Sequence, residues 1–223
     1  MKIEHSTILI TSAGNTMGRA ISCHFAALGA HLIIADSNLS DLDKTHQICS
    51  ELGTDVVSYQ LKDESTDSIR HLFHAIDEEF GSGIDVLINN YIDVTLPSLF
   101  DTQTNDSPLL LTKLASTLFN YGQFAAQNMR KHKKEGVIIN LGHHQNVNQP
   151  CSLDNSKALL TGLTKSWAKE LNPFNIRVGG VTPRLFNKVS AHTVNLINQE
   201  LIKNTEYIVE NDYFNGRILE ATA

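Results

Sequence analysis

The stretch from Thr7 to Leu28 constrains the fold of this chain more than any other part of its 223 residues. Thr7 to Thr11 is a short run rich in β-branched residues, which favours a β-strand. Beyond it, mostly apolar residues recur at helical spacing: Met17, Ala20, Ile21, His24, Phe25 and Leu28. A helix that follows a strand in this way points its free N–H groups at the space above the turn, where nucleotide phosphates commonly bind.

The rest of the chain alternates between strand-like and helix-like segments, which predicts an α/β fold with a doubly wound, mostly parallel sheet. With 41% hydrophobic residues, a chain of this length has room for one domain, residues 1–223, and not for two. We expect long helices at 108–134 and 155–171, with helices on both faces of the sheet. We expect seven strands, at Thr7–Thr11, His31–Ala35, Asp55–Gln60, Gly83–Asn90, Gly136–Leu141, Asn175–Pro183 and Tyr213–Ala221.

Composition narrows the classes of function. The net charge of −6 argues against a nucleic-acid-binding surface, and the one basic run, Arg130 to Lys134, suits the end of a helix. Cys23, Cys49 and Cys151 have no paired spacing, which indicates reduced thiols rather than a disulfide framework or a metal site. No segment approaches the roughly 18 apolar residues of a membrane span, and MKIEHSTILI does not resemble a signal peptide. These features predict a cytoplasmic protein without membrane or nucleic-acid partners.

The turn after the first strand resembles that of the short-chain dehydrogenase/reductase family, T-G-x-x-x-G-x-G. Thr11 and the third glycine, Gly18, are kept, whereas Ser12 and Thr16 replace the first two glycines. In such turns the second glycine lets the backbone approach a pyrophosphate, and the third lets the helix pack on the strand. We therefore expect Gly18 to preserve the fold and the branched side chain of Thr16 to obstruct the phosphates.

Two interpretations of this turn remain open. In the first, Gly14 and Asn15, which both tolerate positive φ, form a different turn that still binds a dinucleotide. Met17 then contacts the cofactor as well. The alternative is a plain connection that binds no nucleotide. Asp36, at the end of the second strand, is placed to accept both ribose hydroxyls of NAD and to repel the 2′-phosphate of NADP, although it also suits the cap of the next helix. The resemblance implies NAD, bound weakly or not at all.

The segment GIDVLINN resembles the family's fourth strand, which ends in N-N-A-G. Asn89 and Asn90 match this pattern, but Tyr91 and Ile92 replace its two smallest residues. The resemblance implies a cofactor contact for Asn89. Tyr91 is either a new catalytic hydroxyl or a bulky side chain that fills an empty cleft.

The family's catalytic residues are an asparagine, a serine after the fifth strand, and a tyrosine and a lysine spaced Y-x-x-x-K. The corresponding residues in this chain are Leu114, His143, Leu153 and Lys157. Only the lysine is retained, and a leucine has no proton that any environment can tune for transfer. His143 and His144 are the available replacements, because histidine titrates near neutrality. The alternative for this pair is a polar loop beneath an open cleft.

Three functions are compatible with these features. The leading one is a family member that has lost hydride transfer and acts as a binding or scaffold subunit. The second is an NAD-dependent oxidoreductase that recruits His143, His144 or Tyr91 for the proton, and the third is a sensor of another nucleotide. We also expect a homo-oligomer through the helices at 108–134 and 155–171, which the family pairs across a two-fold axis and whose apolar stripes exceed what one sheet face covers.

Overall fold

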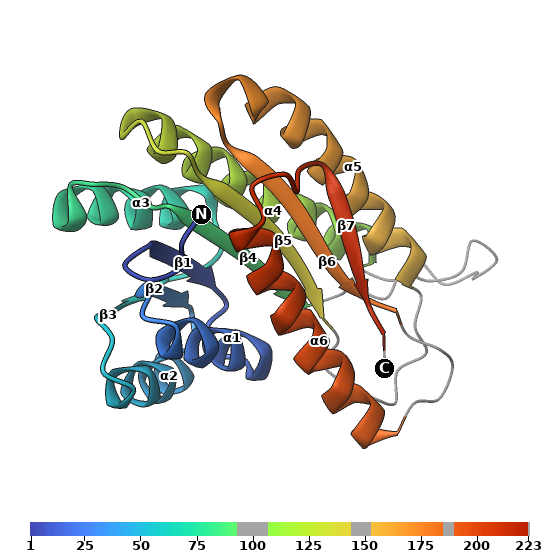
Figure 1. The fold of residues 1–223 in the computed structure, drawn as a ribbon, viewed down its shortest axis with the longest axis horizontal. Helices are drawn as coiled ribbons and strands as arrows, with labels where there is room; N and C mark the ends of the chain where they lie inside the picture. Colours follow the sequence, from blue (N-terminus) through green and yellow to red (C-terminus); the bar gives the residue numbers. More distant parts are fainter. Residues whose placement is uncertain (93–106, 144–152, 185–189, 223) are drawn as a thin grey trace.

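The computed structural model describes residues 1–92, 107–143, 153–184 and 190–222, and these residues form one seven-stranded sheet (Figure 1). The strands lie in the order β3-β2-β1-β4-β5-β6-β7, and every neighbouring pair is parallel. This confirms the predicted doubly wound sheet, whose strand order reverses between β1 and β4. The strands are β1 Thr7–Thr11, β2 His31–Asp36, β3 Val56–Gln60, β4 Val86–Ile92, β5 Val137–His143, β6 Arg177–Pro183 and β7 Arg217–Ala221.

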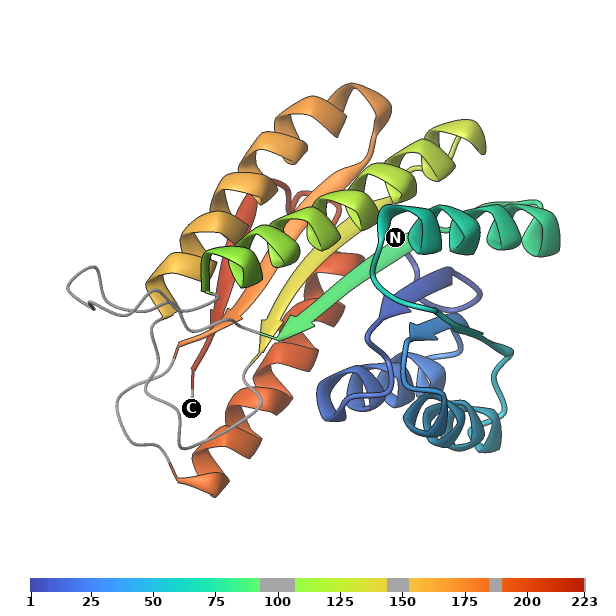
Figure 2. The ribbon, with the colours of Figure 1, turned by 180° about the vertical axis from the view of Figure 1, so that it is seen from behind.

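Helices cover both faces of the sheet. Helices α1, α2 and α6 pack on one face, and α3, α4 and α5 pack on the other (Figures 1 and 2). Their bounds are α1 Thr16–Ala27, α2 Leu39–Glu51, α3 Thr66–Phe80, α4 Ser107–Lys131, α5 Leu153–Leu171 and α6 Ala191–Glu210. Because each helix returns the chain to a parallel strand, the strands end, and α1 and α2 begin, at the same edge of the sheet.

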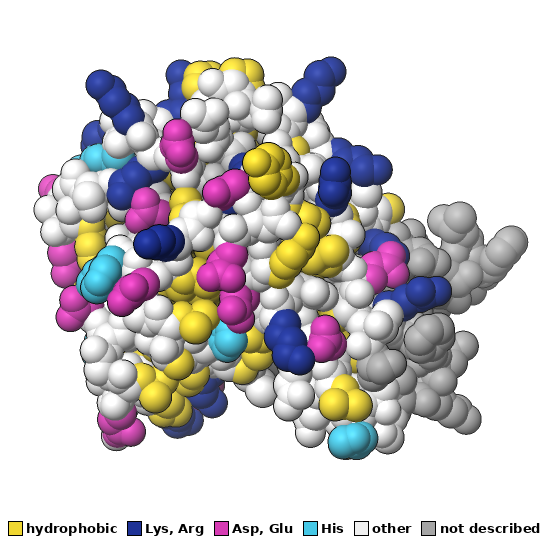
Figure 3. All heavy atoms as spheres, viewed as in Figure 1, with side chains coloured by type: hydrophobic (Ala, Val, Ile, Leu, Met, Phe, Trp, Pro, Cys, Tyr) yellow, Lys and Arg dark blue, Asp and Glu magenta, His cyan; other side chains and the backbone are white. Residues whose placement is uncertain are grey.

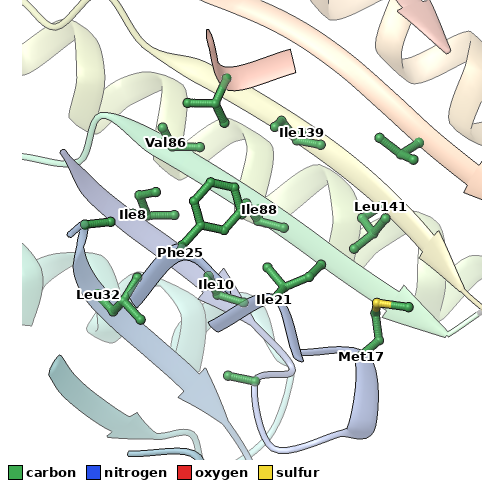
Figure 4. Close-up of a cluster of buried hydrophobic side chains, with 14 of the residues drawn as sticks. Ile8, Ile10, Met17, Ile21, Phe25, Leu32, Val86, Ile88, Ile139 and Leu141 are labelled. Carbon is green, nitrogen blue, oxygen red and sulfur yellow. The ribbon is translucent and has the colours of Figure 1, made fainter. Parts of the chain in front are cut away.

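The central strands are buried on both faces, and every residue of β1 and β5 is buried. Such strands are apolar in continuous runs rather than alternating with polar residues. On the α1 side, Phe25 and Ile21 of α1 pack over Ile8, Ile10, Val86, Ile88 and Ile139 of the sheet (Figure 4). On the other side, the core is built from the apolar stripes of α3, α4 and α5, including Leu72, Ile76, Tyr121, Met129 and Trp167.

The helix starts follow from side-chain caps. Asn15, Asn38, Ser65 and Ser190 each accept a hydrogen bond from the backbone N–H three residues later, at the starts of α1, α2, α3 and α6. This satisfies one of the N–H groups that a helix leaves without a partner at its N-terminus. Serine is among the residues preferred at this position of a helix.

Several boundaries differ from the sequence expectation. β4 runs to Ile92 because it continues to pair with β5, up to His143. Helix α4 ends at Lys131 rather than at 134, since the chain turns there and Lys133 has a φ of 54°. Helix α5 begins at 153 rather than at 155. β7 begins only at Arg217, after the turn at Gly216, which has a φ of 68°.

The surface on the α1, α2 and α6 side carries acidic and basic side chains that are interspersed, with hydrophobic side chains among them (Figure 3). Among the helices that the structure describes, none is long and apolar enough to cross a membrane.

Candidate functional site

The connection from β1 to α1 is a tight turn at the carboxyl edge of the sheet. Ser12 has a φ of 48°, and its carbonyl oxygen accepts a hydrogen bond from Nδ2 of Asn90 at 3.2 Å. The strained residue is therefore Ser12, at the position where the family has glycine. The prediction that Gly14 and Asn15 re-route the turn with positive φ is wrong. Asn15 is extended, with a φ of −72°, because it caps α1.

Gly18 packs directly beneath this turn. A Cβ at residue 18 would lie 2.3 Å from the carbonyl oxygen of Ser12 and 2.7 Å from Cα of Ala13. Both are backbone atoms, so neither yields without distorting the turn. Gly18 is thus required for α1 to approach β1, which is the role expected of the third glycine.

The chain itself caps the start of α1. Oδ1 of Asn15 accepts a hydrogen bond from the Gly18 N–H at 2.7 Å. Thr16 and Met17 are the first two residues of the helix, so helix geometry provides no intrahelical acceptor for their N–H groups. Thr16 is exposed and Met17 is buried. Asn15 thus satisfies one of the N–H groups that a bound phosphate otherwise contacts.

Asp36 lies at the end of β2, opposite the turn. Its Oδ2 accepts a hydrogen bond from the Gly14 N–H at 2.9 Å, and its Oδ1 accepts one from the Asn38 N–H at 2.8 Å. The cap of α2 is Asn38, whose Oδ1 accepts from the Asp41 N–H at 3.2 Å. The alternative prediction that Asp36 caps this helix is therefore wrong, because the helix starts later than Asp36 can reach. The two backbone donors fix the direction of its carboxylate.

These groups surround a cavity of about 640 Å³ above the start of α1. Its wall combines the turn after β1, the start of α1, the end of β2, the start of α2 and part of α6. His143 adds a side chain from the end of β5, where it is 4% exposed. The described residues that line the cavity are Ser12, Gly14, Asn15, Thr16, Met17, Arg19, Asp36, Ser37, Asn38, Asp41, Glu64, His143, Val194 and Asn198.

The charged groups of the cavity are mostly engaged with other parts of the chain. Nη2 of Arg19 donates to the Gly14 carbonyl oxygen at 3.0 Å, and Nε donates to Oγ1 of Thr45 at 3.1 Å. Lys44 contacts Asp41 at 2.9 Å, and this hydrogen bond and charge lower the pKa of the Asp41 carboxyl. Glu64 pairs with Lys113 of α4 at 3.2 Å.

An apolar cluster lies on the opposite face of the same sheet edge. It contains Tyr91, Leu118 and Leu160, with Leu114, Leu163 and Ile218 packed against it. Tyr91 is 7% exposed and pairs with Gly142 across β4 and β5. A Cβ on residue 142 would lie 2.6 Å from the Tyr91 hydroxyl, so the ring fills space that the glycine leaves open.

Lys157 lies on the first turns of α5, four residues after Leu153, the first residue of that helix. Its ammonium group contacts the Glu220 carboxylate of β7, and Nε of Arg184 lies 3.9 Å from the same carboxylate. Lys157 is not among the described residues that line the cavity. The structure therefore places the retained lysine against β7.

The structure brings some of the predicted site residues together and separates others. Ser12, Thr16, Met17, Asp36 and His143 line one cavity, with Gly18 beneath it. Asn89 faces the other helix layer, where its Nδ2 donates to the Leu118 carbonyl oxygen at 3.1 Å. Leu114 and Lys157 lie outside the lining, and His144 lies outside the described residues.

Sequence reasoning missed several lining residues: Arg19, Asn38, Asp41, Glu64, Val194 and Asn198. Asn38 has a recognisable signal, because it precedes the apolar pattern of α2 and is a favourable cap residue. Val194 and Asn198 share one face of α6 through their spacing, but only the packing of α6 on the sheet brings that face to the cavity.

Comparison with known proteins places this architecture in a family. A sequence model described as short chain dehydrogenase matches residues 6–199. A 3-oxoacyl-acyl-carrier-protein reductase of Thermotoga maritima is 32% identical over 187 residues, which cover 82% of this chain and 75% of that protein. A 3alpha-hydroxysteroid dehydrogenase of Mediterraneibacter gnavus is 30% identical over 190 residues, covering 82% and 74% of the two chains.

Solved structures show the same fold at lower identity. A short-chain type dehydrogenase/reductase from Mycobacterium marinum superimposes with a TM-score of 0.82 at 22% identity, covering 98% of this chain and 94% of that one. An NAD⁺-bound xylitol dehydrogenase gives 0.81 at 19% identity, covering 100% and 99%. Sequence and fold agree, and the chain belongs to the short-chain dehydrogenase family of oxidoreductases.

Proposed function

We propose that this chain has lost the standard hydride transfer of its family and serves as a binding or scaffold subunit. The observation that carries the proposal is the apolar cluster around Tyr91, between the sheet and helices α4 and α5. Leu114 stands where the family pattern has its asparagine, and it packs against this cluster. A leucine side chain neither donates nor accepts a proton, so the position of the family's asparagine offers no polar group to a reaction.

The residues around Lys157 support the same conclusion. In the family pattern this lysine lowers the pKa of a tyrosine one helical turn earlier, but residue 153 is a leucine. Lys157 instead forms an ion pair with Glu220, a residue of a different element. A lysine that is paired in this way has a structural explanation that requires no substrate or cofactor.

The cavity fits only part of a dinucleotide. Asp36 suits the ribose hydroxyls of NAD and repels the additional phosphate of NADP. The Gly14 and Gly18 N–H groups, which lie where phosphates would bind, already donate to Asp36 and Asn15. When bound, NAD would supply the hydride acceptor, but the residues present fit its pyrophosphate poorly. We therefore propose that NAD binds weakly or not at all, and better than NADP.

A second candidate function is an NAD-dependent oxidoreductase in which His143 carries the proton. The observation that favours it is that His143 lines the cavity, in the position of the family's serine. The relatives named above are a reductase and a dehydrogenase, which agrees with a redox activity. Tyr91 is a weaker candidate, because its ring belongs to the apolar cluster on the opposite face.

The experiment that separates these functions follows NADH absorbance with a panel of ketones, and NAD reduction with the matching alcohols. We expect no turnover by the unmodified protein. Turnover that disappears in His143→Ala would contradict the proposal and establish the second candidate. An Asn198→Ala variant, which alters the same cavity without removing an acid or base, is the matched control.

We further propose that the chain forms a homo-oligomer through α4 and α5. A groove of about 200 Å³ lies between these helices on their outer side. Phe119 and Phe174 line it and are 45% and 42% exposed, and Trp167 forms part of its wall. Apolar side chains in such a groove are stabilised when a second copy covers them, and a two-fold axis places the same groove on both partners.

The state of the thiols supports a location in the cytoplasm, which is part of this proposal. Cys23 and Cys49 are free thiols on α1 and α2, and Cys151 lies outside the described residues. Burial, together with the neighbouring Cys23, raises the pKa of Cys49 to about 12. Cys49 therefore stays protonated and unreactive, which suits a protein that keeps its cysteines reduced.

A further inference from the structure

Helices α1 and α2 pack side by side on one face of the sheet (Figure 1). Near their first turns, Nε of Arg19 in α1 donates to Oγ1 of Thr45 in α2 at 3.1 Å. Residues four apart share one face of a helix, so Cys23 and Cys49, each four residues further on, lie on the same two faces. Because both helices begin at the same edge of the sheet, they run in the same direction. The two cysteines therefore lie opposite each other, one turn beyond the contact between Arg19 and Thr45.

The two thiols contact each other at the boundary between core and solvent. The Cys49 S–H donates a hydrogen bond to the sulfur of Cys23, and this bond contributes to the raised pKa of Cys49. Cys49 is 0% exposed and belongs to the hydrophobic cluster on this face, whereas Cys23 is half-buried and packs against that cluster. A reagent in solvent therefore meets Cys23 first, with Cys49 directly behind it.

The same two helices form part of the wall of the cavity at the carboxyl edge of the sheet. Met17 and Arg19 of α1 line it together with Asp41 of α2. Cys23 lies about one helical turn beyond Arg19, and Cys49 lies about two turns beyond Asp41. A covalent bond between the two cysteines would hold α1 and α2 at a fixed spacing beside the cavity.

We propose that Cys23 and Cys49 form a redox switch, in which hydrogen peroxide converts the two thiols into a disulfide that joins α1 to α2. This device is separate from the proposed loss of hydride transfer. The resting state has both thiols reduced, and disulfides in cytosolic proteins, where they occur, are usually transient or redox-sensing. A small dithiol reverses the switch by thiol–disulfide exchange.

The oxidation proceeds in two steps. The Cys23 sulfur attacks one oxygen of the peroxide, the O–O bond breaks, and a sulfenic acid and one water form. Cys49 is buried and protonated, so it does not react with the peroxide itself. Its sulfur attacks the sulfenic sulfur of Cys23, the S–O bond breaks, and the hydroxyl leaves with the Cys49 proton as a second water. The two sulfurs lose two electrons, which the peroxide gains.

Mass spectrometry of the full chain tests the switch in a Cys151→Ser background, which removes the third cysteine. After treatment with peroxide and digestion without reductant, we expect a linked pair of peptides that contain Cys23 and Cys49. The intact protein should be lighter by two hydrogen atoms, and dithiothreitol should restore its mass. The Tm of the oxidised protein should rise by about 5 °C or more, because the disulfide closes a loop in the unfolded chain.

Two matched variants separate the roles of the cysteines. In Cys49→Ala the sulfenic acid at Cys23 has no thiol to react with, so dimedone, a reagent for sulfenic acids, should label Cys23. In Cys23→Ala dimedone should not label Cys49. Neither variant should show the rise in Tm on oxidation.

Amide hydrogen exchange locates the effect of the disulfide. Exchange in the oxidised protein should be slower in α1 and α2 and unchanged in α4 and α5, on the other face of the sheet. A disulfide between two copies of the chain, oxidation of Cys23 to a sulfinic acid without a link, labelling of Cys49 in Cys23→Ala, or two unreacted thiols at millimolar peroxide would each overturn the switch. None of these measurements involves NADH, so the proposed loss of hydride transfer is tested separately.

Discussion

The hydroxyl of Tyr91 lies 2.6 Å from the position that a Cβ on residue 142 would occupy. The two residues pair across β4 and β5, on the face that packs against α4 and α5. A large side chain on one strand and glycine on its neighbour thus complement each other in volume. This complementarity packs the end of the sheet tightly, next to Leu118 and Leu160.

Gly142→Ala should therefore destabilise the protein by about 1–3 kcal/mol, because the added methyl group forces the buried Tyr91 ring from its position. In a Tyr91→Leu background the same substitution should cost less, which gives a coupling energy in a double-mutant cycle. Gly162→Ala is the control, since its Cβ would meet nothing within 4 Å. Chemical denaturation provides the free energies, and additive effects of Gly142→Ala and Tyr91→Leu would contradict the packing described.

Light scattering should show a dimer or tetramer at micromolar concentration rather than a 24.7 kDa monomer. Phe119→Arg places a charge in the groove between α4 and α5 and should shift the protein towards the monomer. Tyr213→Arg is the matched control, because Tyr213 is 94% exposed on the turn before β7. A monomeric unmodified protein, or equal effects of the two variants, would contradict an interface at this groove.

Thermal unfolding measures the cofactor preference. A ligand at about 100 times its dissociation constant stabilises by roughly 2.7 kcal/mol, which raises the Tm of a chain of this size by roughly 5 to 10 °C. We expect millimolar NAD to raise the Tm by less than this. NADP should raise the Tm less than NAD does, because the Asp36 carboxylate repels its 2′-phosphate.

Ser12→Gly with Thr16→Gly should increase the rise with NAD, since the first change relieves the φ of 48° and the second clears the exposed start of α1. The doubly substituted protein without ligand provides the reference Tm. A full rise with NAD in the unmodified protein, or a larger one with NADP, would show that the turn is not an obstacle.

Acid stability should depend on Asp77, which joins α3 to α4. Its carboxylate accepts from Asn128 at 2.7 Å and contacts Lys131 and His132, each at 2.8 Å. Burial alone raises the pKa of Asp77, but the hydrogen bonds and charges of Lys131 and His132 outweigh it, so the pKa is lowered. A lowered pKa gives stability that is complete above the unfolded value of about 3.9 and is lost as the pH falls through the folded value.

Asp77→Asn should therefore cost about 1–2 kcal/mol at neutral pH, and the difference from the unmodified protein should shrink below about pH 4. Denaturation curves across this pH range provide the measurement, with Glu78→Gln, an exposed neighbour, as the control. A difference that stays constant with pH would mean that the Asp77 carboxylate does not act through its charge.

The fold was predictable from the sequence because its signals are local. The change to helical spacing after Thr11 and the segments predicted as strands depend on neighbouring residues alone, and the structure has a helix and seven strands there. The order of the strands, which no local pattern contains, is known only from the structure. The observed ends of elements differ from the predicted ones where strand pairing determines them, as at Ile92, the last residue of β4.

The candidate site was predictable only in part, because it depends on contacts between distant residues. Asp36 is predicted from its place at the end of a strand and His143 from its correspondence to the family's serine, and both line the cavity. The ion pair of Lys157 could not be predicted from the sequence. Its partner, Glu220, is 63 residues away along the chain and contacts Lys157 only because α5 packs on β7. The positive φ at Ser12 is not predictable from the serine itself, and only the glycine that the family has at this position indicates it.

Restoring one catalytic group should not restore activity. In Leu153→Tyr the new phenol would have Lys157 one turn away, but Leu114 and His143 would still stand at the asparagine and serine positions. General acid–base catalysis contributes about 10²- to 10⁴-fold only when donor and substrate are held in geometry. We expect no turnover from this variant in the NADH assay. The comparison is a triple variant with Leu153→Tyr, His143→Ser and Leu114→Asn. Turnover by Leu153→Tyr that equals turnover by an active triple variant would show that Leu114 and His143 do not prevent hydride transfer.

Loss of hydride transfer is the central claim, and a single-turnover measurement tests it most directly. With the unmodified protein in excess over NADH, absorbance is followed after mixing with each ketone, so that slow product release does not hide the chemical step. We predict that NADH decays no faster than in buffer with ketone alone. Faster decay with any ketone, abolished in His143→Ala, would contradict the claim and assign the proton transfer to His143.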